Sequence, residues 1–115
     1  MISEKFSRQH RQIAAKCREL DLKRKKEATA RAKAVSELLK RKYGASSVIL
    51  YGSFAEGGYH DHSDIDLLVY DFKGPYWEMY SEAEQIAAPF KVSVVCSEDA
   101  SPSLIEHVRE KGVTL

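Results

Sequence analysis

Two aspartates stand one residue apart at the start of the apolar run DIDLLV, which begins at Asp64. Residues two apart on a β-strand point to the same face, so Asp64 and Asp66 would present their carboxylates side by side. Two negative charges beside a core are costly unless a positive charge lies between them. Paired carboxylate oxygens suit Mg²⁺, which completes its coordination shell with water and substrate phosphates. The pattern predicts a metal site, and the plainer alternative is a solvated strand end.

Upstream, Gly52 and Ser53 directly follow the apolar run SVILY. Glycine allows backbone N–H groups to approach a phosphate closely, and the serine hydroxyl can donate to it. A helix that begins there would add a favourable dipole. A phosphate cradle near a cation site is what a nucleoside triphosphate needs. The sequence has no G-x-x-x-x-G-K-[ST] motif, so this cradle is not a P-loop.

This combination resembles the minimal nucleotidyltransferases of the DNA polymerase β-like superfamily, whose fingerprint is G-S-x-A-x-G followed by S-D-x-D-L. The matching residues are Gly52, Ser53, Ala55 and Gly57, then Ser63, Asp64, Asp66 and Leu67. The resemblance covers roughly residues 28–115. It implies transfer of a nucleoside monophosphate, usually AMP from Mg-ATP, to a hydroxyl. By the same resemblance Gly52, Ser53 and Ser63 would bind the nucleotide, and Asp64 and Asp66 would hold the metal and serve catalysis.

The chain departs from the family at the third carboxylate. The family places three carboxylates around two metal ions, the third in a later segment that reads like V-D-L-V. The matching segment here is VSVV, with Ser93 in the aspartate position. A neutral serine cannot bind the second metal or activate the nucleophile, and losing an acid–base function typically lowers the rate by roughly 10²–10⁴. Glu98 and Asp99 follow in a predicted loop as an alternative source of the charge.

Three functions therefore remain open. The first is a nucleotidyltransferase, weakened where Ser93 replaces the acid. The second is a catalytically degenerate binding module, because small domains of this superfamily often pair with an all-helical HEPN-type toxin as its antitoxin. The third is a regulatory subunit that senses ATP without turnover.

Other candidate groups each have a structural alternative. His60, Asp61 and His62 would form a polar loop, although His62 is a candidate phosphate contact. Tyr76, Trp77 and Tyr80 would belong to the core, with base stacking as the alternative. Lys91 shares the predicted face of Ser93 and is a candidate phosphate contact. The basic run of residues 23–26 reads as a solvated helix face.

A long helix must lie ahead of these motifs, because residues 3–43 contain no glycine or proline and are rich in helix formers. One apolar face recurs at steps of three and four, through Ala28, Ala32, Val35, Leu39 and Tyr43. Gly44 would end the helix. A straight helix of this span would be about 60 Å long, so we expect it either to break near Asp21 or to project. A projecting segment suggests a partner or a homo-oligomer.

The remaining elements alternate between strand and helix patterns. We expect four strands, at Ser47–Tyr51, Asp64–Tyr70, Phe90–Cys96 and Val113–Leu115, and a loop at Gly52–Ser63. We also expect two helices after the second strand. The first would bury Trp77, Tyr80, Ala83 and Ala87 and end at Pro89, and the second would run from Ser101-Pro102 to Gly112. The order predicts an α/β (α+β) fold, a small mixed sheet flanked by helices. We expect two parts, a helical extension (1–27) and the nucleotidyltransferase-like domain (28–115).

Composition narrows the setting. The formal net charge is +1, which gives no drive toward nucleic acid or acidic membranes. No apolar run approaches the roughly 18 residues of a membrane span, and the N-terminus lacks a signal-peptide core. Cys17 and Cys96 lie far apart, which fits free thiols in a reducing cytoplasm. We therefore expect a cytoplasmic protein.

Overall fold

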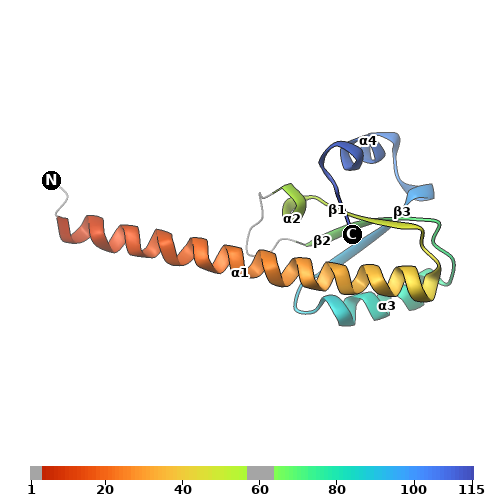
Figure 1. Ribbon diagram of the computed structural model, residues 1–115, viewed down its shortest axis with the longest axis horizontal. Coiled ribbons are helices and arrows are strands. Elements are labelled where there is room, and N and C mark those ends of the chain that lie inside the picture. The colour runs from red at the N-terminus through yellow and green to blue at the C-terminus, as the bar shows by residue number, and fades with distance from the viewer. Residues whose placement is uncertain (1–3, 57–63) are drawn as a thin grey trace.

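The computed structural model describes residues 4–56 and 64–115, with the backbone alone for residues 4–21, 53 and 56 (Figure 1). Its elements are α1 (Glu4–Tyr43), β1 (Ser47–Tyr51), α2 (Ser53–Glu56), β2 (Ile65–Tyr70), α3 (Tyr76–Ala87), β3 (Val92–Cys96), the 3₁₀ turn η1 (Ser97–Asp99), α4 (Pro102–Lys111) and β4 (Val113–Thr114). The predicted mixed α+β fold is confirmed. In the described part of the chain, no helix is both long and apolar enough to span a membrane.

The four strands form one mixed sheet in the order β3-β2-β1-β4. β1 is antiparallel to β2 and to β4, whereas β2 and β3 are parallel. The register places Asp66 opposite Tyr51 on one side and opposite Ser93 on the other. Three neighbouring strands therefore bring these three side chains to the same face of the sheet at the same end.

The main core lies between the sheet and two helices, α1 and α3. Ile65, Leu67 and Val69 of β2 are fully buried on this side, as the alternation of the sequence predicts. The predicted apolar face of α1 is confirmed, because all five of its residues are at most 3% exposed. Gly44, with φ +68°, follows the helix in the left-handed conformation that glycine adopts without strain.

α4 packs on the other face of the sheet, opposite α1 and α3 (Figure 1). Ser101 caps it, because its side-chain oxygen accepts a hydrogen bond from the backbone N–H of Leu104 at 3.2 Å. Val108 is 1% exposed and lies against β1 near Ile49. The helix ends at Gly112, so both of its predicted ends are confirmed.

α1 is one continuous helix, so of the two outcomes that the sequence left open, a break near Asp21 or a projecting helix, the break does not occur. Aspartate in a helix interior costs less than about 1 kcal/mol relative to alanine, and its helix-forming neighbours easily offset that penalty. The molecule extends over 62 × 29 × 18 Å, and the N-terminal half of α1 projects beyond the domain (Figure 1). The side chains of the weak stripe formed by Ile13, Cys17 and Leu20 lie outside those that the structure describes.

Three smaller expectations also need correction. Trp77 is 77% exposed, because α3 instead buries Met79, Ala83 and Ala87, a face with the same periodicity. The predicted loop after β1 begins with the helical turn α2. Two strands start later than predicted, β2 after Asp64 and β3 at Val92. Pro89 does follow the end of α3, and Ala88 before it has ψ 140°, outside the helical region that a proline disfavours in its predecessor.

Candidate functional site

The turn after β1 and the second aspartate are in direct proximity. Gly52 has φ +77°, and a Cβ atom built on it would lie 2.6 Å from Oδ2 of Asp66. Only glycine combines that backbone conformation with that approach. The main chain then turns into α2, where the N–H of Ala55 donates to the carbonyl of Gly52 at 3.1 Å. The two halves of the fingerprint therefore meet at one point.

The two aspartates share an electrostatic environment. Asp66 lies in β2 and is half-buried, whereas Asp64 precedes the strand and is exposed. Burial raises the pKa of Asp66, and the neighbouring charge of Asp64 raises it further. A cation between the two carboxylates would reverse both effects. This donor set therefore fits a hard divalent cation held by one or two carboxylates.

Ser93 lies beside Asp66, at the register position directly across from it on β3. The sequence-predicted position of the third carboxylate is therefore at the site, but it carries a neutral hydroxyl. Glu98 and Asp99 follow the opposite end of β3, in η1. Five strand residues span about 16 Å, so neither acid replaces the missing charge. Among the side chains that the structure describes, no group of three or more from His, Cys, Asp or Glu is arranged to hold a metal.

Tyr51 belongs to this site, although the sequence analysis missed it. It pairs with Asp66 in the antiparallel register. Burial raises the pKa of Tyr51, and the charge of Asp66 is the second cause. The sequence signal is its place immediately before Gly52, but the β1–β2 register is needed to bring the ring to Asp66.

A hollow of about 340 Å³ lies on the other side of the sheet end, lined by Tyr80, Glu84, Phe90, Lys91 and Val92. Burial raises the pKa of Tyr80, and the charges of Glu84 and Asp64 contribute to the same shift. The charge of Asp64 therefore acts on one residue of the hollow, and exposed Lys91 supplies a cation to its lining. Phe90 also packs edge-on against Phe54 of α2, with ring centroids 5.7 Å apart, which fixes α2 against the start of β3.

Several predicted residues lie outside the described residues. Ser63, Gly57 and the group of residues 60–62 fall in the segment 57–63. Ser53 is the first residue of α2, but its side chain is among those not described.

The family model for polymerase beta nucleotidyltransferases matches residues 33–115. No curated protein matches the chain. A solved minimal nucleotidyltransferase is 29% identical over 76% of this chain and 91% of its own, with a TM-score of 0.62. A toxin–antitoxin structure with AMP-PNP is 26% identical over 70% of this chain and 69% of its own, with a TM-score of 0.58.

A third solved structure is that of a tri-AMPylated Shewanella oneidensis HEPN toxin in complex with its MNT antitoxin. It is 22% identical over 76% of this chain and 70% of its own, with a TM-score of 0.57, and at this identity it shows the fold alone. The sheet, the juxtaposed motifs and the family match over most of the chain agree. This chain belongs to the polymerase beta nucleotidyltransferase family.

Proposed function

We propose that this chain transfers AMP from Mg-ATP to a hydroxyl acceptor, at a rate lowered by Ser93. One observation carries the proposal: the turn at Gly52 closely approaches the carboxylate of Asp66. A cradle for phosphate and a pair of acids for a cation then lie together, as a nucleoside triphosphate requires. The family match supports nucleotide transfer, and the AMP-PNP in a related toxin–antitoxin structure supports an adenine nucleotide.

Asp64 and Asp66 would hold Mg²⁺, with the backbone at Gly52 and the hydroxyls of Ser53 and Ser63 binding phosphate oxygens. The metal would supply charge neutralisation to the triphosphate. In the reaction a bond forms between the acceptor oxygen and the α-phosphorus, the bond to the β-phosphate oxygen breaks, and pyrophosphate leaves. Beside Asp66, Ser93 offers no base for the acceptor proton, so that proton passes to solvent. Ser93 would therefore lower the rate of the chemical step.

A second function is favoured by the same residue. Ser93 is the register partner of Asp66, where the family has an acid, and this substitution is what a domain retained for binding alone would tolerate. Such a domain would act as the antitoxin of a HEPN-type helical toxin. The toxin–antitoxin structure that is 26% identical supports a toxin partner.

Calorimetric titration of Mg-ATP tests whether the site required by the first function is present. We expect the wild type to bind Mg-ATP and the variant Asp64→Ala/Asp66→Ala to lose binding. The matched control is Glu106→Ala/Glu110→Ala, which removes two exposed carboxylates of α4 far from the site along the chain and should bind as the wild type does. A wild type without Mg-ATP binding would exclude the enzyme and leave the binding module.

Ser93→Asp tests the missing acid directly. We expect Mn²⁺ titration followed by electron paramagnetic resonance, with ATP present, to find an additional bound ion in this variant relative to the wild type. Ser93→Asn, which adds bulk without charge, should retain the wild-type number. If Ser93→Asp binds no additional ion, the position is not that of the third ligand.

A further inference from the structure

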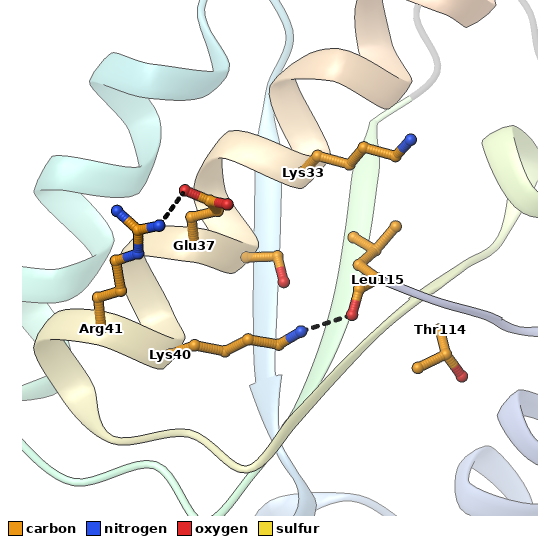
Figure 2. Close-up of a pocket in the computed structure, with 7 residues that line it drawn as sticks. Lys33, Glu37, Lys40, Arg41, Thr114 and Leu115 are labelled. Carbon is orange, nitrogen blue, oxygen red and sulfur yellow. Dashed lines mark hydrogen bonds and ion pairs between the residues drawn. The ribbon is translucent and has the colours of Figure 1, made fainter.

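Two adjoining hollows of about 490 and 310 Å³ follow one flank of α1 and share Lys33. Among the described residues, the first is lined by Leu22, Lys25, Lys26, Thr29, Ala30 and Lys33, and the second by Lys33, Ser36, Glu37, Lys40, Arg41, Thr114 and Leu115. We call this surface the α1 groove. Figure 2 shows its second half, where Lys33 and Lys40 extend from α1 toward the side on which Leu115 lies.

The α1 groove is strongly cationic. Five of its residues are lysine or arginine, and its only acid is Glu37. That acid is already paired with Arg41, at 3.5 Å. Within the described part of the chain, exposed Lys26 and Lys33 have no ion-pair or hydrogen-bond partner. Lys40 donates to the carbonyl of Leu115 at 2.6 Å and keeps two further protons for another acceptor. Most of the positive charge of the groove is therefore not neutralised by the described residues around it.

The spacing of the groove residues indicates which secondary structure a bound segment of a partner would have. Lys26, Lys33 and Lys40 are seven residues apart, which is about 10.5 Å along a helix. A second helix lying along α1 repeats its facing positions at the same interval, as in coiled coils, where flanking charges choose the partner. On an extended strand, side chains on one face repeat every 6.7 Å or so and fall out of step with the lysines. An acidic helix therefore matches this row better than an acidic strand.

Apolar surface accompanies the charge. Leu22 is 59% exposed at one end of the groove, and Ala30 and Leu115 line the hollows farther along. The other flank of α1 is already occupied by α3, through Lys42 with Glu82 at 2.5 Å and Arg31 with the carbonyl of Ile86 at 3.5 Å. The groove flank, which reaches Thr114 of β4, holds the two hollows instead.

We propose that the α1 groove docks an acidic amphipathic helix of a partner protein, with carboxylates repeated every seven residues along Lys26, Lys33 and Lys40. The inference does not rest on nucleotide transfer. It goes beyond the helical toxin partner proposed above, because it assigns the surface of contact and the charge of the partner. Leu22 and Ala30 would receive the apolar side of that helix.

The test uses the full chain and a labelled, end-blocked peptide of about three heptads, with leucine and glutamate each repeated every seven residues on adjoining positions. Binding is followed by fluorescence anisotropy at low salt. We expect Lys26→Glu/Lys33→Glu to weaken binding by roughly ten- to thirtyfold, because two attractions become repulsions. A peptide with lysine in place of glutamate should bind that variant better than the wild type. The control Lys73→Glu/Lys111→Glu makes the same charge change outside the groove and should leave affinity within about twofold.

Four outcomes would overturn the proposal. The wild type could show no binding to the glutamate peptide, or the control could lose as much affinity as the groove variant. Sedimentation could find a dimer of the wild type that dissociates in Lys26→Glu/Lys33→Glu, which would assign the groove to a second copy. A single-stranded RNA of mixed sequence could bind the groove more tightly than the peptide. Mg-ATP titration of the same variants keeps this result separate from the nucleotide site.

Discussion

Gly52 has a positive φ, and a Cβ atom at this position would point at the carboxylate of Asp66. Each of these two properties disfavours a residue that carries a side chain. We expect Gly52→Ala to lower the free energy of unfolding by about 1–3 kcal/mol, the range for a strained backbone residue. The added Cβ, 2.6 Å from Oδ2 of Asp66, would also displace that carboxylate. Urea denaturation gives the stability, and Mg-ATP titration gives the loss of binding.

Gly44 provides the matched control for Gly52. Its φ is +68°, but a Cβ there would meet the side chain of Lys73 only at 3.5 Å, an ordinary contact. Gly44→Ala should therefore cost about 1 kcal/mol from the backbone alone and leave Mg-ATP binding intact. Equal losses of binding in both variants would show that the contact with Asp66 is not the reason for Gly52.

The raised pKa of Asp66 has a consequence for stability. A carboxyl group whose pKa is higher in the folded state is protonated more readily there, so folding loses stability as the pH rises through that pKa. Asp66→Asn should then stabilise the metal-free protein at neutral pH and make little difference at a pH below the ordinary pKa of aspartate. Thermal denaturation across this pH range, with EDTA present, measures the difference.

Added Mg²⁺ should raise the melting temperature of the wild type at neutral pH more than that of Asp66→Asn, because the variant keeps only one of the two carboxylates. A variant that is less stable than the metal-free wild type at neutral pH would contradict the pKa argument.

Residue types at fixed spacing were enough to predict the pairing of the glycine turn with the aspartates. Asp66 and Ser93 needed only the alternation of strand residues to be placed on one face. Tyr51 could not be found in this way, because its nearness to Asp66 depends on the register between β1 and β2. Trp77 was misplaced because two overlapping faces of α3 share the same period.

At the scale of elements, β3 lies at the edge of the sheet, and two of its carbonyls that point away from the sheet accept hydrogen bonds from side chains. The carbonyl of Lys91 points toward β2, where it accepts from Ile65, so those of Val92 and Val94 point away from the sheet. Tyr80 and Tyr76 of α3 donate their hydroxyls to these two carbonyls, at 3.0 and 2.7 Å. This arrangement blocks the edge against another strand.

We expect Tyr76→Phe/Tyr80→Phe to lose about 1–3 kcal/mol of stability, the sum for two neutral hydrogen bonds. The variant should also scatter more light on prolonged incubation, because its edge strand can pair with another chain. The control is Tyr70→Phe, which removes a hydroxyl at the end of β2 that bonds to none of the described residues. Unchanged stability and scattering in the double variant would show that the hydroxyls do not protect the edge.

Elements with a single strong pattern were predicted well, and elements set by tertiary contact were not. The sequence of α4 has both a capping serine and a terminal glycine, so both ends of this helix were predicted correctly. The sequence of α1 has a regular apolar stripe, so its buried face was predicted correctly. The late starts of β2 and β3 reflect hydrogen bonding to neighbours, which no local pattern records. The unbroken course of α1 past Asp21 reflects helix-forming neighbours on both sides, against which one aspartate has little effect.

At the scale of the whole molecule, the projecting half of α1 should contribute little to folding. Among the side chains of α1 that the structure describes, those from Leu22 onward, the first in the main core is Ala28. Deleting residues 1–20 should change the free energy of unfolding by less than about 1 kcal/mol, because surface changes away from the core are usually small. The hydrodynamic radius should fall. Urea denaturation and sedimentation velocity check both. A truncated chain that no longer unfolds cooperatively would show that the projecting half is part of the fold.

The exposure of Trp77 also decides how this protein can be observed. It is the only tryptophan of the chain, and at 77% exposed its indole already meets water in the folded state. Its emission should therefore lie near that of a solvated indole and shift little on denaturation, so tryptophan fluorescence would be a poor monitor of unfolding. The same exposure makes the emission of Trp77 sensitive to any partner that covers its indole. A blue shift on adding a partner would mean that the partner lies on α3, whereas a helix bound beside β4 should leave the emission unchanged.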